Sequence, residues 1–346
     1  MTTRVSFTTR VGRSVLAALG AVSLSAAVLN APAHAADTGL FGTQDATYDG
    51  VYRQSLAIAG LAAADARIPA AAIDWLGDQQ CADGSFEAFR PNTSTPCSPS
   101  DPENFSGPDT NSTAMAAIAL YLAGRTAPAR DAIVWLNNVQ NGDWGFPFYA
   151  GGASDANSTG LSVVAMQTVQ PQDRSGRVPN AQAWISGLKL KCLSGGGLAY
   201  QKGGPANGLA SSQAYMGLSG ALPVDPVDTL SPNPDCKKRN AVSNVGSFLA
   251  SAITKDGAVQ SDFGSGADYS STGWAVLGLV ANGVGKGAVK SGVSTLTKDV
   301  ESYTYSDGDL VPAAAGLLLM VAAATDEDPR SFGGINLKRA LIGSMQ

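Results

Sequence analysis

Polar and apolar positions fall into blocks along this chain, and the blocks repeat. Three times a short stretch with an Asp and several hydroxyl residues runs directly into an apolar run, at residues 108–113, 154–160 and 267–273. Asp, Ser and Thr accept hydrogen bonds from the free N–H groups of a first helical turn, and a carboxylate suits the positive end of the helix dipole. Each stretch therefore predicts a helix start. The apolar run that follows lacks a polar stripe, which predicts a helix buried on most sides.

Each apolar block is followed by an amphipathic one with an aromatic residue, and six such pairs recur at intervals of roughly 40 to 60 residues. The apolar blocks would form an inner ring and the amphipathic ones an outer ring. The sequence therefore predicts an all-α fold, an α6/α6 toroid in one domain over residues 36–346. The predicted inner helices are 52–64, four starting at Asp109, Asp155, Asn207 and Asp268, and 311–324. The outer ones are 69–76, 127–136, 181–188, one carrying Phe248, 293–303 and 337–344.

The first 35 residues have a different pattern. Three arginines precede an apolar run at 15–29, and a small-residue site ends at Ala35. This order is typical of a secretory signal peptide cleaved after Ala35. The alternative is a membrane anchor, which needs about 20 apolar residues, and the run at 15–29 is shorter than that. We therefore predict a secreted protein.

Removal of this segment changes the charge and the available chemistry. It takes three arginines and no acidic residue, which lowers the formal charge from −5 to −8, and it takes His34, the only histidine. Without histidine the mature chain has no Ser-His or Cys-His pair and no His-ligated metal. Its acidic balance argues against nucleic acid as a partner. We expect no metal, no cofactor and no membrane span in the mature chain, because the run at 311–324 is too short.

Four cysteines remain in the mature chain, and an even number in an exported chain predicts disulfides. Three pairings are possible. We favour Cys81–Cys97 and Cys192–Cys236, because each pair flanks a long loop whose closure restrains the unfolded chain by on the order of 3–4 kcal/mol.

The blocks resemble a known repeat. Trp-Leu, then Gln, then Asp-Gly-Ser-Phe, then Asp-x-Asn-Ser-Thr-Ala and an apolar helix is similar to the prenyltransferase and squalene-cyclase repeat. Residues 80–86 and 140–146 look like its Gln–Trp motif, with Trp144 nearest to the pattern. The helices at Asp109 and Asp155 also resemble the cobalamin-carrier α-domain. The resemblance runs from about residue 48 onward and implies an α/α toroid, a ring that hosts several unrelated activities.

The chain departs from each family where the chemistry lies. The Asp-x-Asp-Asp acid motif of squalene-type cyclases is missing, since 307–310 and 326–329 lack its last Asp. The mature chain has no His for a prenyltransferase zinc, no Cys-Gly-Glu-Gln thioester stretch and no β-domain of a cobalamin carrier. We therefore predict no catalytic residue, and the sequence leans away from an enzyme without deciding the question.

Three carboxylates are candidates for a site. Asp109, Asp155 and Asp268 begin inner helices, which start at the same end of a toroid, so they would ring the mouth of the central cavity. There they could recognise a polar ligand group or a cation. One alternative is that these residues only cap their helices. Another is a glycosidase, which would use two such carboxylates as acid and base.

Aromatic residues are the second set of candidates. Trp144, Phe146, Phe148 and Tyr149 share a glycine-containing loop, and Trp274 is the only tryptophan on an inner helix. Such rings can line a pocket. The alternative is that they wedge neighbouring helix pairs together.

Together these observations favour a secreted, non-catalytic toroid that binds a hydrophobic or corrin-like small molecule at the mouth of its ring. Two alternatives stay open: a divergent terpene-cyclase-like or carbohydrate-active enzyme, and a structural or surface-interaction module. Neither the identity of the ligand nor the oligomeric state follows from the sequence.

Overall fold

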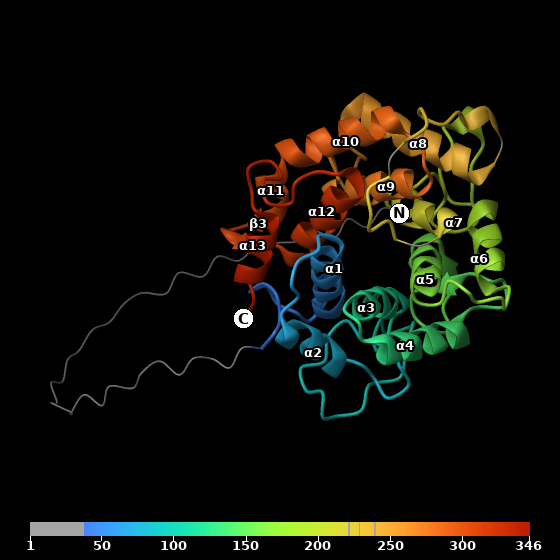
Figure 1. Ribbon diagram of the computed structural model, residues 1–346. Helices are drawn as coiled ribbons and strands as arrows, with labels where there is room; N and C mark the ends of the chain where they lie inside the picture. Colours follow the sequence, from blue (N-terminus) through green and yellow to red (C-terminus); the bar gives the residue numbers. More distant parts are fainter. Residues whose placement is uncertain (1–37, 221, 228, 239) are drawn as a thin grey trace, which may run out of the picture. The chain divides into compact units, whose positions relative to one another are not determined.

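The computed structural model describes residues 38–220, 222–227, 229–238 and 240–346, so the predicted signal peptide lies outside the described residues. The described helices form an inner and an outer ring (Figure 1), which confirms the predicted all-α toroid. The inner ring consists of α1 (Gly50–Ala63), α3 (Thr110–Leu122), α5 (Ala156–Val169), α7 (Gly208–Ser219), α9 (Tyr269–Ala281) and α12 (Pro312–Thr325). The outer ring consists of α2 (Ala70–Asp78), α4 (Thr126–Val139), α6 (Arg177–Gly187), α8 (Ala241–Asp256), α10 (Lys286–Lys298), the short α11 (Val300–Thr304) and α13 (Leu337–Gly343).

The inner ring closes on itself. Each inner helix packs against the next, and α12 packs back against α1. Glycines permit this closing contact: a Cβ placed on Gly60 would lie 2.3 Å from the carbonyl oxygen of Gly316, and one on Gly316 would lie 2.3 Å from that of Leu56. Because these obstacles are backbone atoms, the two helices can approach this closely only where both contact residues are glycines.

The repeated polar stretches cap the inner helices. Asp109, Asp155 and Asp268 each accept a hydrogen bond at Oδ1 from the N–H three residues later, at 2.7 to 2.9 Å. In α7, Asn207 accepts the same bond from Ala210 at 2.7 Å. The helix whose start lacks an Asp in the sequence is therefore capped in the same way, because an amide oxygen serves as well as a carboxylate.

A second bond fastens each preceding loop to its inner helix. The hydroxyl four residues after the cap accepts the backbone N–H of the loop: Thr113 from Phe86 at 3.0 Å and Thr159 from Phe146 at 2.9 Å. Ser211 and Thr272 repeat this in the next units. The recurring pattern of Asp followed by hydroxyl residues thus encodes both the helix start and the position of the loop before it.

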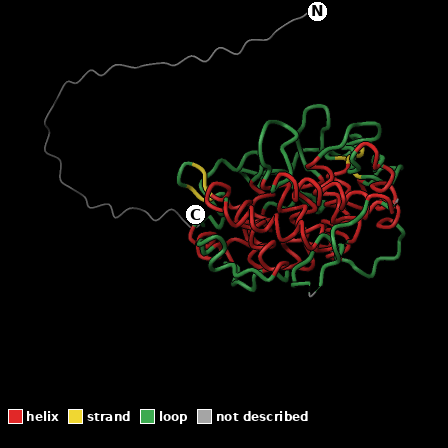
Figure 2. Tube along the Cα trace, turned by 90° about the horizontal axis from the view of Figure 1, so that it is seen from above, coloured by secondary structure: helices red, strands yellow, loops and turns green. Residues whose placement is uncertain are grey.

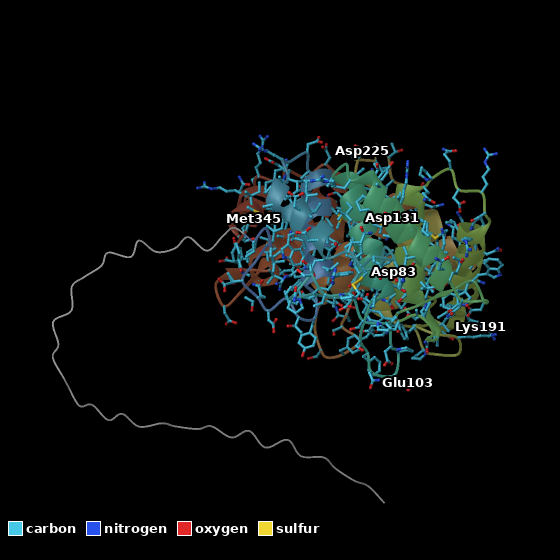
Figure 3. All side chains as sticks on the ribbon, turned by 90° about the horizontal axis from the view of Figure 1, so that it is seen from below. Asp83, Glu103, Asp131, Lys191, Asp225 and Met345 are labelled. Atoms are coloured by element: carbon cyan, nitrogen blue, oxygen red, sulfur yellow. A yellow bond between two sulfur atoms is a disulfide. The ribbon has the colours of Figure 1, made fainter. Side chains whose placement is uncertain are left out.

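Strands are short and confined to loops in the described chain. β1 (Phe146–Pro147) pairs antiparallel with β2 (Ser154–Asp155), and β3 (Tyr305–Ser306) with β4 (Asp309–Leu310). Seen from the side, the helices occupy one layer with loops above and below (Figure 2). Glu103, in a loop before an inner helix, and Asp225, in the segment after one, lie at opposite edges of that layer (Figure 3).

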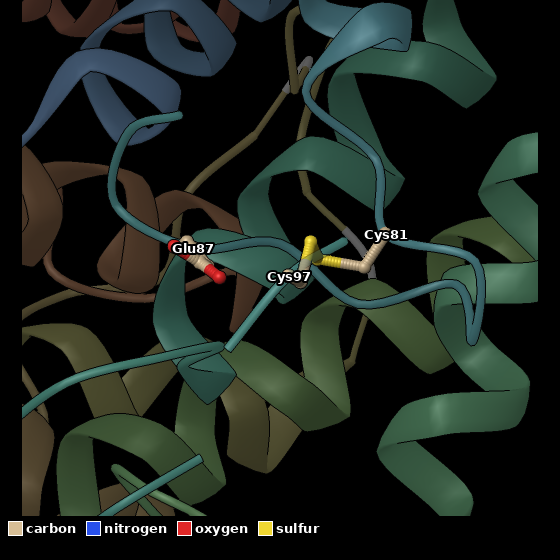
Figure 4. Close-up of side chains that lie close together, drawn as sticks. All are labelled: Cys81, Glu87 and Cys97. Atoms are coloured by element: carbon tan, nitrogen blue, oxygen red, sulfur yellow. A yellow bond between two sulfur atoms is a disulfide. The ribbon is translucent and has the colours of Figure 1, made fainter. Parts of the chain in front are cut away.

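Both predicted disulfides form. Cys81 is bonded to Cys97 and Cys192 to Cys236. Glu87 lies beside the first of them (Figure 4), with a carboxylate oxygen within 4.8 Å of both sulfurs. A metal is bound by thiolates, and these sulfurs are already joined to each other, so we interpret this group as a cross-link.

Two outer helices begin earlier than predicted. The third was expected from residue 181, but α6 begins at Arg177. The fifth outer helix was expected over residues 293–303, but α10 begins at Lys286 and ends at Lys298, and α11 follows separately. The stretch 286–292 contains two glycines, which lowers its intrinsic helix propensity. Packing decides instead, because Ala288 and Val289 are buried against the core.

No helix in the described part of the chain is long and apolar enough to cross a membrane. The apolar run of α12 is 14 residues long and serves as an inner helix of the ring.

Candidate functional site

A cavity of about 890 Å³ opens where the inner helices begin. Its walls come from the first turns of α1, α3, α5, α7 and α9 and from the loops before them. Eight aromatic rings line it: Tyr48, Tyr52, Phe89, Phe105, Phe148, Tyr149, Tyr200 and Phe263. Four carboxylates and four amides accompany them: Asp49, Glu87, Asp109, Asp155, Asn111, Asn157, Asn207 and Gln213. A mostly apolar lining with a few polar groups is typical of a small-molecule site.

Three of the eight rings lie at the outer rim of the cavity and are unusually exposed for aromatic side chains. Tyr48 is 87% exposed, Phe105 78% and Phe263 87%. Phe105 adopts a left-handed backbone conformation with φ of 52°, which a bulky residue rarely does. Its carbonyl accepts the Tyr149 hydroxyl at 2.9 Å, and the Phe148 and Tyr149 rings meet edge to face at 4.7 Å. Phe105, Phe148 and Tyr149 are therefore held against one another, while Phe105 stays largely open to solvent.

Asp109 stands at the start of α3 and is almost fully buried. Its Oδ1 accepts the N–H of Ser112 at 2.7 Å. Burial raises the pKa of this carboxyl from 3.8 to about 6, although the bonds from Ser112 and Asn111 oppose the shift. The phenols of Tyr52 and Tyr149 feel its negative charge, which adds to the burial that raises the pKa of both.

Asp155 stands at the start of α5 and is equally buried. Both of its oxygens are engaged: Oδ1 accepts Ser158 N–H at 2.8 Å and Oδ2 accepts the Ser158 hydroxyl at 2.8 Å. Burial raises the pKa of Asp155 as well. Tyr200 lines the cavity with Asp155, and burial together with the charge of Asp155 raises the pKa of Tyr200 to about 12.

Buried amides and hydroxyls complete the lining. Asn157 of α5 donates to the amide oxygen of Gln213 of α7 at 2.6 Å, which links two inner helices across the cavity wall. Within the described residues, the Oδ1 of Asn111 and the hydroxyl of Tyr52 are buried without a hydrogen-bond partner. Unpaired buried polar atoms are costly, so both atoms are candidates to meet a ligand.

The structure brings only part of the predicted site together. Asp109, Asp155, Phe148 and Tyr149 line the cavity. Asp268 caps α9 in the same way, but it is not part of the lining, and only Ser270 of that helix reaches it.

The other three predicted aromatic residues lie elsewhere. Phe146 is buried in the core beside the start of α5, and Trp144 lies half-exposed in a turn where its carbonyl accepts the Gln140 amide. Trp274 is buried and does not line the cavity. It stands six residues after its cap, and Met115 and Leu161, at the equivalent positions, are buried too. The inner ring is thus packed with apolar side chains within two turns of the helix starts.

Of the eight rings that line the cavity, the sequence analysis named only Phe148 and Tyr149, and Tyr48, Tyr200 and Phe263 are among those that it missed. Each lies in a loop shortly before an inner helix, as Tyr149 does. Applying to every unit the reasoning used for the Tyr149 loop would have found them.

The disulfide between Cys81 and Cys97 steadies one wall. It closes the loop that carries Glu87 and Phe89, both of which line the cavity. Arg90 reinforces this loop because its guanidinium donates to the carbonyls of Thr93 and Thr95 at 2.9 and 2.6 Å.

No known family model matches the chain, and no curated protein sequence does. Solved structures are similar to it. A protein from Actinoplanes is 15% identical with a TM-score of 0.52, over 83% of this chain and 93% of that one. A novel alpha-amylase from Clostridium perfringens is 13% identical with a TM-score of 0.52, over 78% and 86%.

A third similar structure is ent-copalyl diphosphate synthase from Streptomyces platensis, 17% identical with a TM-score of 0.50. The match covers 79% of this chain and 50% of the synthase, so the chain spans about half the length of that enzyme. At these identities the likeness shows the fold alone. It agrees with the resemblance to terpene-cyclase-type toroids seen in the sequence, and the ring hosts unrelated activities.

Proposed function

We propose that this protein is a secreted, non-catalytic binding protein that holds a small organic molecule in the cavity at the helix starts. The observation that carries the proposal is the cavity itself, which combines eight aromatic rings with a few buried polar groups. An open cavity of about 890 Å³ also favours binding over a purely structural module, for which a filled ring would be expected. The two disulfides fit an exported protein.

The state of the two buried carboxylates supports a non-catalytic role. Asp109 and Asp155 each cap the helix that they begin, and both oxygens of Asp155 are occupied by hydrogen bonds. A general acid or base must instead present an oxygen to the reacting group. We therefore assign both residues to shaping the cavity and its electrostatic field.

The lining also limits which ligands fit the hydrophobic or corrin-like class expected from the sequence. It contains four carboxylates, and no Lys, Arg or His is found among the described residues that form it. Four carboxylates without a basic residue in the described lining disfavour an anionic ligand, so the proposed ligand is apolar in body and carries no net negative charge.

Native mass spectrometry of the protein secreted by its own host tests the proposal. We expect a bound mass that is released on denaturation and is lost in the double variant Phe148→Ala/Tyr149→Ala. Leu193→Ala is the matched control, because Leu193 is a fully exposed apolar residue outside the cavity lining. A protein that carries no bound mass and whose cavity residues respond to no small molecule in a fragment screen would overturn the proposal.

An enzyme is the second candidate, and one observation favours it. A carboxyl with a pKa of about 6, Asp109, lies in the cavity with a second carboxyl, Asp155, at the start of the neighbouring inner helix. A glycosidase needs such a pair, one member to protonate the leaving group and the other to act as base or nucleophile. The similar structure named as an alpha-amylase adds a reason to test α-glucans first.

Turnover decides between the two candidates. If the protein is an enzyme, Asp109→Asn and Asp155→Asn each abolish product formation while Asp268→Asn retains it, because Asp268 caps α9 outside the lining. If it is a binding protein, no variant differs from the background rate of α-glucan or terpenoid conversion.

A further inference from the structure

The two buried carboxylates of the cavity have no cationic partner within the described chain. The ion pairs there join Arg53 to Asp49 and Arg125 to Asp74, and neither involves Asp109 or Asp155. Burial without a counter-charge disfavours the ionised form, which is why the pKa of both carboxyls is raised. A positive charge brought into the cavity would relieve this cost.

Hydrogen bonds within the protein already occupy most of the acceptor oxygens of Asp109 and Asp155. Ser158 occupies both oxygens of Asp155 through its backbone N–H and its hydroxyl. Ser112 donates its backbone N–H to Oδ1 of Asp109. Such bonds satisfy lone pairs but leave the negative charge in place. A neutral polyol would therefore find few free acceptors on Asp155, whereas a cation would still gain the negative charge of both carboxylates.

Tyrosine rings accompany both carboxylates. Tyr52, Tyr149 and Tyr200 line the same cavity as the two carboxylates, and the backbone of Tyr149 forms an antiparallel bridge with that of Asp109. The faces of aromatic rings attract cations, and cages of such rings are the usual recognition device for quaternary ammonium groups. Carboxylates beside several rings, in a lining without basic residues, combine the two attractions.

We propose that the cavity selects an organic cation, a quaternary or alkylated ammonium group with an apolar body, over a neutral molecule of the same shape. This inference rests on the proposed binding function and specifies the class of its ligand. The ammonium group would lie between Asp109 and Asp155, and the apolar body would lie against the rim rings.

The test compares a cation with its carbon isostere. Choline and 3,3-dimethyl-1-butanol have nearly the same shape and differ in the charged nitrogen. We titrate each into the full mature protein at pH 7 and low salt, by calorimetry and by NMR. We expect choline to bind at least about tenfold more tightly, as cation–π contacts and unpaired carboxylates together would give.

Variants assign the preference to the site. Asp155→Asn keeps a helix cap, as Asn207 does in α7, and removes the charge. It should reduce choline affinity severalfold and leave 3,3-dimethyl-1-butanol unaffected. Asp268→Asn makes the same change at the equivalent cap outside the lining and should alter neither affinity. Should Asp155→Asn fail to fold, Phe263→Ala replaces it, since that ring is mostly exposed and its loss should still weaken choline binding.

The outcomes separate this inference from the function on which it rests. If choline binds no more tightly than its isostere while both perturb the cavity residues, charge selection is overturned and the binding function stands. If neither probe binds and the fragment screen also finds nothing, both are overturned. A preference for choline that survives Asp155→Asn and Phe263→Ala alike overturns the assignment to this cavity.

Discussion

The inner helices pack closely along most of their length, but most of their first turns border an open cavity. Beyond their first turn the helices pack closely: α1 and α12 touch through Gly60 and Gly316, and α5 approaches α7 through Gly160. The starts of five of them, all except α12, surround a cavity lined by rings, carboxylates and amides. One repeated sequence unit therefore builds an open mouth and, within about two turns of it, a closely packed ring.

The difference lies in which residues the repeat fixes and which it leaves free. The cap and the hydroxyl after it recur in successive units and hold each helix start to its loop. The loop residues between these anchors differ from unit to unit, and they supply the rim. Recognition can thus vary in the loops without disturbing the ring, as is common where a rigid scaffold carries variable loops.

Breaking the closed region should have the largest effect. Gly316→Val places a branched side chain against the backbone of α1, where even a Cβ would lie 2.3 Å from the Leu56 carbonyl oxygen. We expect the free energy of unfolding to fall by about 3 kcal/mol or more, because the backbone cannot move aside as a side chain could. Urea denaturation measures this loss.

Gly77→Ala is the matched control for that prediction. Gly77 lies in the outer helix α2, and a Cβ there meets nothing within 4 Å. Alanine should therefore stabilise the protein slightly through helix propensity. Equal stability of Gly316→Val and the wild type would show that the ring does not depend on its closing contact.

The next effect concerns the bond between loop and helix. Thr159→Val preserves shape but removes the hydroxyl that accepts Phe146 N–H at 2.9 Å and donates to the Asp155 carbonyl at 2.6 Å. It leaves a buried N–H without its partner, which costs about 2 kcal/mol. Thr168→Val, on the same helix, is the control. Its hydroxyl is buried and unpartnered within the described protein, so its removal should leave stability unchanged or raise it.

These two regions also show what the sequence could and could not predict. The ring was predictable because caps and apolar runs are local signals that recur, and Asn207 shows that even a weaker copy was placed correctly. The cavity lining was only partly predictable. Phe146 and Tyr149 share one loop, yet one is core and the other lines the cavity, since the pairing of β1 with β2 decides which way each part of the loop runs. An aromatic residue such as Trp274 can face a ligand, but its indole lies among apolar helices and is buried in the core.

A smaller effect should come from the charge of Asp109. Its pKa is about 6 when folded, against 3.8 for an ordinary Asp, so the folded protein holds this proton over a range where the unfolded chain has lost it. Its contribution to stability is therefore fully present below about pH 4 and falls as the pH rises through about 6. Asp109→Asn should match the wild type at pH 3.5 and be more stable at pH 7 by about 1–2 kcal/mol.

Thermal unfolding between pH 3.5 and 7.5 measures this crossover. Asp268→Asn is the control, because Asp268 occupies the same capping position but is less buried. A variant at position 109 that tracks the wild type at every pH would show that this carboxyl is better solvated than its position indicates.

The smallest effect on stability should come from the rim, and it is the one that sharpens the comparison most. Phe263 is 87% exposed, so Phe263→Ala removes few contacts and should change the free energy of unfolding by less than about 0.5 kcal/mol. Phe146→Ala, in the closed part of the molecule, should cost about 3–5 kcal/mol because it leaves a hole in the core. Choline binding should respond in the opposite order, weakened by Phe263→Ala and unchanged by any destabilising variant measured while still folded. If Phe263→Ala destabilises the protein and leaves binding intact, the rim is part of the scaffold, and the separation of a fixed ring from a recognising mouth does not hold.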